Sequence, residues 1–252
     1  MPSAIRKDQD LADDGLVAML DESQGADERT LQSFLWQRFP ENGCFSSVGV
    51  FVPIPESRGI PHAAVIGVDG RLLWAGNPLR DSQRVDELIE EQLRLVAKGW
   101  GDSSDARKVR AKLYGKGDLA GAAGLVEKMD DGEEKQTLQK EVETRYAVRK
   151  NAVEALRQQG RWRDALEAAE ELAKSVGRHP AWSAEVEGLV GGFGTAAAKA
   201  ELDADKDLEK ILRVMRKGKL DRAPRDLEKL VEKHGQTRVA ARAARVLAAL
   251  RS

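Results

Sequence analysis

The hydrophobic pattern of the chain changes character near residue 101. Before that point, short and continuously apolar runs alternate with amphipathic stretches, and after it apolar residues recur at spacings of three and four. Continuous short runs are typical of strands buried on both faces, whereas spacings of three and four are typical of helices packed on one side. The pattern therefore predicts an α/β domain over residues 1–100 and an all-α helical-hairpin domain over residues 101–252.

The first part predicts helices and strands in alternation, and Pro40 stops the second helix. The hairpin is the strongest of these signals, because two apolar runs are joined across Asp69 and Gly70, a dipeptide typical of tight hairpin turns. The predicted elements are a helix over 1–13, a strand over 15–20, a helix over 27–38, a strand over 48–52, the hairpin over 63–75 and a helix over 82–98.

Ile60 and Pro61 lead directly into this hairpin, and a break at Gly76 follows it. A proline is tolerated at the entrance of a strand, where a cis peptide bond can also occur. With this order of proline, hairpin and glycine, residues 1–98 resemble the thioredoxin-like superfamily, and within it the TlpA/ResA kind of disulfide reductase. The resemblance implies a thioredoxin-like fold without its first strand and its Cys-x-x-Cys turn. It also implies that Ile60 and Pro61 line a groove for an extended substrate. His62, the next residue, is either a third groove residue or an ordinary residue of the strand.

The start of the chain leaves two explanations open. In those reductases an internal Met-Pro step precedes a strand. Met1 and Pro2 precede the apolar run that begins at Gly15 by the same spacing. Either translation begins upstream of Met1, or the catalytic segment has been lost. An upstream signal sequence would make the protein extracytoplasmic, or periplasmic. As written, the N-terminus has no apolar signal region, which predicts a cytoplasmic protein.

Thiol–disulfide exchange, the activity that the resemblance implies, needs an attacking thiolate and a second thiol that releases the mixed disulfide. Cys44 is the only cysteine in the sequence, and its neighbours indicate a turn beside Glu41 rather than an electropositive site that would activate a thiol. We therefore expect no redox turnover and assign no catalytic residue. Whether an enzymatic activity of the family survives stays open.

Three segments of the second part share a short pattern. Gly117, Gly160 and Gly218 are each followed by a large apolar residue two positions later and an alanine five positions later, with 43 and 58 residues between successive glycines. The segments resemble tetratricopeptide-like helical hairpins, in which such a glycine ends one helix and the small alanine lets the next helix pack closely. Hairpins of this kind favour a second hypothesis for function, a non-enzymatic scaffold that binds a protein or peptide partner.

Charge and composition narrow the range of partners. With a formal net charge of −1, the chain lacks the basic footprint of a nucleic-acid binder, and the basic runs Arg145–Lys150 and Arg213–Lys219 are interpreted as solvated helix faces. No apolar run approaches the roughly 20 residues that span a bilayer. His62, His179 and His234 have no cysteine or acidic companion at the spacing of metal ligands, so we expect neither a metal nor another cofactor.

Overall fold

The structure is a computed structural model. Within residues 62–251, contacts between residues form two compact units, residues 62–138 and residues 139–251, which are called the first and second unit below. The domain limits at residues 100 and 101, which follow the change in hydrophobic pattern, stay a prediction. The structure describes residues 62–251 without a break and, before them, residues 11, 16–22, 27, 30, 31, 34 and 45–48.

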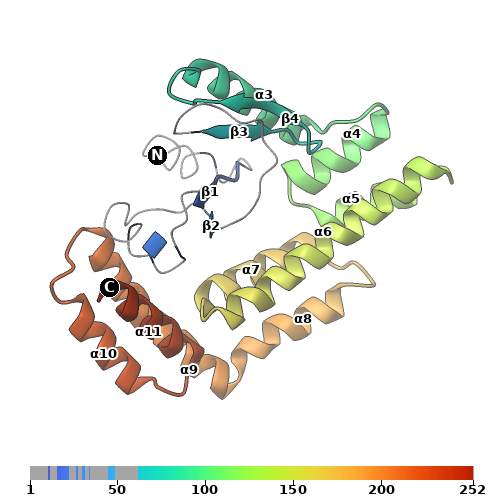
Figure 1. Ribbon diagram of the computed structural model, residues 1–252. Coiled ribbons are helices and arrows are strands. Elements are labelled where there is room, and N and C mark those ends of the chain that lie inside the picture. The colour runs from blue at the N-terminus through green and yellow to red at the C-terminus, as the bar shows by residue number, and fades with distance from the viewer. Residues whose placement is uncertain are drawn as a thin grey trace. The chain divides into compact units, whose positions relative to one another are not determined.

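The described strands form two separate sheets of two strands each (Figure 1). β1 (Met19–Glu22) pairs in parallel with β2 (Phe45–Val48), and β3 (Ala63–Ile66) pairs with β4 (Leu72–Gly76) in antiparallel fashion. The β3–β4 pair confirms the predicted hairpin. Its turn contains Gly70 at a φ of 79°, a left-handed conformation that glycine adopts without the steric cost of a side chain.

The expectation of an α/β thioredoxin-like fold is wrong. From Ser82 onward the described chain is helical, and its strands do not join into one sheet with helices on both faces. A two-stranded ribbon buries too little apolar surface to form the centre of a domain. The strands expected at 15–20 and 48–52 are displaced to β1 and β2, and most of the helices expected at 1–13 and 27–38 lies outside the described residues.

In the first unit, α3 (Ser82–Lys98) confirms the helix predicted over the same residues, and it buries Leu88 of its apolar face. The chain then reverses tightly at Gly99, where a Cβ atom would lie 1.8 Å from the carbonyl oxygen of Arg107. Ser103 begins the next helix by accepting a hydrogen bond from the N–H of Ala106. The remaining elements are α4 (Ser104–Arg110), the π-helical turn η1 (Ala111–Gly115), α5 (Leu119–Glu127) and the first residues of α6 (Glu133–Gln158).

The second unit is made of helices packed around one hydrophobic core. α9 is its central element, because it contacts α7, α10 and α11, and α10 lies beside α11 (Figure 1). The side chains of Leu208 and Leu212 on α9 are almost fully buried in this core. The helices that follow the rest of α6 are α7 (Trp162–Val176), α8 (Ser183–Gly191), the short 3-10 helix η2 (Gly192–Gly194), α9 (Ala196–Arg216), α10 (Ala223–Lys233) and α11 (Arg238–Leu250).

The glycine–alanine pattern that repeats in the sequence has the predicted local structure. The three glycines follow helical segments and have φ values of 63°, 75° and 74°, the left-handed conformation that ends a helix. The three alanines, Ala122, Ala165 and Ala223, are all buried in the helix that begins next. At Gly160 the close approach is direct, since a Cβ atom there would lie 2.8 Å from the carbonyl oxygen of Arg238. The kinship with tetratricopeptide-like hairpins stays a prediction.

Candidate functional site

Of the groove residues expected from the sequence, His62 alone lies among the described residues. Ile60 and Pro61 lie outside the described residues, as does Cys44, whereas His62 is half-buried and directly precedes β3. The proposed groove therefore stays a prediction.

Among the residues that the structure describes, no three histidine, cysteine, aspartate or glutamate side chains cluster closely enough to hold a metal ion. His179 stacks on Trp182, with ring centroids 3.9 Å apart, and His234 lies 3.2 Å from the carboxylate of Asp207. Both histidine side chains therefore take part in contacts within the second unit.

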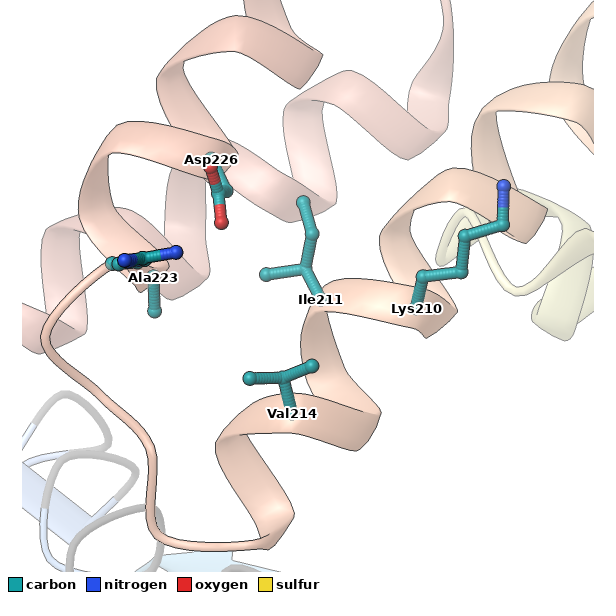
Figure 2. Close-up of a pocket in the computed structure, with 6 residues that line it drawn as sticks. Lys210, Ile211, Val214, Ala223 and Asp226 are labelled. Carbon is teal, nitrogen blue, oxygen red and sulfur yellow. The ribbon is translucent and has the colours of Figure 1, made fainter.

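A pocket opens on the second unit between α9 and α10 (Figure 2). Its volume is about 200 Å³, and apolar and charged side chains share its wall. Ile211 is half-buried, whereas Val214 is 47% exposed although it is apolar. The lining residues are Lys210, Ile211, Val214, Arg222, Ala223 and Asp226.

Local sequence explains why a pocket forms here. Ile211 and Val214 are three residues apart on α9, and Ala223 and Asp226 are three residues apart on α10, so each pair shares one helix face. Ala223 is the alanine of the third repeat, and its single methyl group leaves the space that a larger side chain would fill. The repeat that brings the two helices together therefore also leaves the hollow between them.

Some charged groups at the pocket are paired with other side chains, and others are not. Lys210 donates a hydrogen bond to Asp207 over 2.9 Å, and Lys233 donates to the same carboxylate over 2.8 Å. The bonds from Lys233 and Lys210, with a smaller contribution from His234, hold the pKa of Asp207 well below its usual value. By contrast, the side chains of Arg222 and Asp226 have no ion pair or hydrogen bond within residues 62–251. Both are exposed and available to a ligand.

A second polar cluster of the same unit is internally satisfied. The phenol of Tyr146 donates to Glu185, and Lys150 donates to the other oxygen of that carboxylate over 2.9 Å. Burial and the bond to Glu185 raise the pKa of Tyr146, while Tyr146 and Lys150 lower the pKa of Glu185. Trp182 stacks on Tyr146 with ring centroids 4.6 Å apart. The cluster holds α6 against the start of α8 and presents no activated nucleophile.

The pocket is not predicted by the sequence pattern. Ala223 is assigned there to close helix packing, which agrees with its burial, and Arg213–Lys219 to a solvated face, which fits the exposed Arg213, Lys217 and Lys219 but not the buried Met215. The available signal was Val214, an apolar residue directly after Arg213 in a stretch interpreted as a solvated helix face. Only the position of α10 shows that it faces a hollow.

No protein-family model, curated protein or solved structure matches the chain. The kinship with TlpA/ResA-like proteins is therefore still only a prediction. Among the described helices, none combines the length and the apolar content needed to cross a membrane.

Proposed function

We propose that the second unit is a non-enzymatic protein-binding module, and that the α9–α10 pocket takes one apolar side chain of a partner. The observation that supports this most is the exposure of Val214 beside Ile211, with space left by Ala223. An apolar side chain placed there would remove these atoms from water.

The size of the pocket favours a protein partner over a small molecule. Pockets that hold small molecules and cofactors measure roughly 300–1,000 Å³. The pocket volume of about 200 Å³ is smaller and suits a single leucine- or isoleucine-sized group. Burial of such a side chain contributes roughly 1.5–3 kcal/mol. Further contacts with a partner on the surrounding helix surface are needed for specific binding, as on other helical-repeat surfaces.

Redox turnover is not part of this proposal. The chain has one cysteine, and release of a mixed disulfide needs a second thiol. Dithiol-dependent reduction of insulin by the full chain would contradict this statement.

The test is a selection of random peptides displayed on phage against the full chain, followed by affinity measurements on the selected peptides. Val214→Glu places a charge in the pocket, and we expect it to weaken binding by at least about tenfold, since burial of a charge against apolar groups is costly. Val148→Glu is the matched control, because Val148 is an exposed valine of α6, 52% exposed, that does not line the pocket. Selected peptides that bind both variants as well as the wild type would overturn the proposal.

A further inference from the structure

We infer that the partner segment is acidic, with carboxylates on either side of the apolar residue that enters the α9–α10 pocket. This inference rests on the proposed function and adds the chemistry of the ligand. Residues 213–226, which run from the last turn of α9 to the first turn of α10, contain six cations and two anions, whereas the whole chain has a formal net charge of −1. We call this stretch the basic turn.

Most charges of the basic turn are uncompensated within the described residues. Arg216 is paired, because its guanidinium lies 2.6 Å from Glu209. The other five cations have no ion pair or hydrogen bond from their side chains within residues 62–251, and all five are exposed. They are Arg213, Lys217, Lys219, Arg222 and Arg225.

The basic turn and the pocket are one surface. Arg222 belongs to both, since it lines the pocket and directly precedes α10. Lys210, which also lines the pocket, already binds Asp207, so Arg222 is the cation of the wall that is open to a ligand. A ligand whose apolar group fills the pocket would therefore bring its neighbouring groups to the basic turn.

The combination favours an acidic peptide over a nucleic acid. A phosphate backbone would gain from the cations but has no aliphatic group for the pocket. A peptide offers both an aliphatic side chain and carboxylates. Since the contacts at the basic turn are exposed, they would act mainly on the rate and specificity of association and would weaken with salt.

The experiment uses three fluorescein-labelled peptides that share a central leucine, which is flanked on each side by two glutamates, two glutamines or two lysines. Binding to the full wild-type chain is measured by fluorescence polarisation at 50 mM and 300 mM NaCl. We expect the glutamate peptide to bind roughly five- to tenfold more tightly than the glutamine peptide at low salt, because each of its four carboxylates can form an exposed ion pair of modest strength. This preference should shrink at high salt, and the lysine peptide should bind most weakly.

Protein variants test whether the preference for glutamate arises from the basic turn. Lys219→Glu with Arg222→Glu should abolish the preference for glutamate, while Glu90→Lys with Glu91→Lys, exposed acids on α3, is the charge control and should leave it unchanged. Circular dichroism verifies that each variant is folded. Peptides are compared on the same wild-type protein, so the first result does not depend on any variant.

The outcomes separate the two proposals. Equal affinity for the glutamate and glutamine peptides, together with weaker binding by Val214→Glu, would overturn the acidic partner and leave the pocket as a binding site. The acidic partner would also be overturned if the glutamate peptide did not bind at 1 mM while binding of the phage-selected peptides was still weakened by Val214→Glu. If every peptide bound Val214→Glu as tightly as the wild type, the proposed function would be overturned as well. Displacement of the glutamate peptide by a 12-nucleotide single-stranded DNA at equal or lower concentration would overturn the peptide in favour of nucleic acid.

Discussion

Each unit of the molecule uses a helix side chain to accept backbone hydrogen bonds from a neighbouring element, but the acceptors differ. In the first unit, the amide of Gln92 on α3 accepts from the N–H of Val68 at the β3–β4 turn over 3.0 Å. In the second unit, the carboxylate of Asp205 on α9 accepts from the N–H of Arg163 over 2.8 Å. One turn before Asp205, Glu201 accepts from two N–H groups at the start of α11, over 2.9 and 3.2 Å.

The difference follows from what each neighbour needs. A hairpin satisfies most of its backbone groups within its own ladder, so one neutral amide is sufficient at its turn. The first turn of a helix leaves up to four N–H groups without a partner and has a partial positive charge. The cap residue of α7, Arg161, makes no side-chain bond to these groups, so Asp205 supplies the acceptor from another helix. A carboxylate suits this place because it adds a favourable charge to the hydrogen bond.

The carboxylate also introduces a buried charge. Asp205 is 4% exposed, and Arg242 of α11 lies 3.3 Å from its other oxygen. Burial raises the pKa of Asp205, although the bond from Arg163 and the charge of Arg242 act in the opposite direction. Asp205 therefore connects three helices through one group, which makes the second unit sensitive to its loss.

The largest expected effect is that of Asp205→Ala. The change leaves the partly buried guanidinium of Arg242, 23% exposed, without its carboxylate and removes the acceptor at the start of α7, so we expect a loss of roughly 3–5 kcal/mol in the free energy of unfolding. Asp203→Ala, an exposed acid of the same helix, should change it by less than about 0.5 kcal/mol. Urea unfolding followed by circular dichroism measures both. Equal effects of the two variants would show that the second unit does not depend on the carboxylate of Asp205.

A smaller effect should appear in the pH dependence. The folded pKa of Asp205 is raised above its ordinary value near 3.8, so the folded state holds this proton more tightly than the unfolded state. The stability from this group is therefore greatest below pH 4 and falls as pH rises through the folded pKa. Asp205→Asn does not titrate, so the stability lost in that variant should be larger at pH 4 than at pH 7. A difference that grows with pH would contradict the raised pKa.

The smallest effect is expected in the first unit. Gln92→Ala removes a half-buried neutral hydrogen bond, for which the cost is about 0.5–1.5 kcal/mol. Hydrogen exchange of the Val68 amide, measured by NMR, should become faster, and the stability change should not vary between pH 4 and pH 7. Glu91→Ala, an exposed neighbour on α3, is the control and should leave the exchange of Val68 unchanged.

The sequence by itself determined the local structure of the chain. The helix over 82–98, the hairpin around Asp69 and Gly70, and the glycine–alanine pattern at the helix starts were all predicted. These features depend on residues close together in the chain: the period of the apolar positions, the tolerance of glycine for positive φ, and the small volume of alanine. The same local reasoning was wrong about the fold of the first part, because the pairing of strands depends on distant segments.

Only the tertiary structure decided which surfaces meet. Arg163 and Asp205 are 42 residues apart, Asp205 and Arg242 are 37 apart, and no periodicity relates them. The α9–α10 pocket likewise depends on Val214 and Ala223 facing the same space from two helices. Amphipathic patterns show which face of a helix is buried, but the packing of side chains selects the partner of that face and the hollows that remain. The candidate site is therefore a product of packing, and the sequence pattern assigned two of its residues, Ala223 and Val214, only to close helix packing and a solvated face.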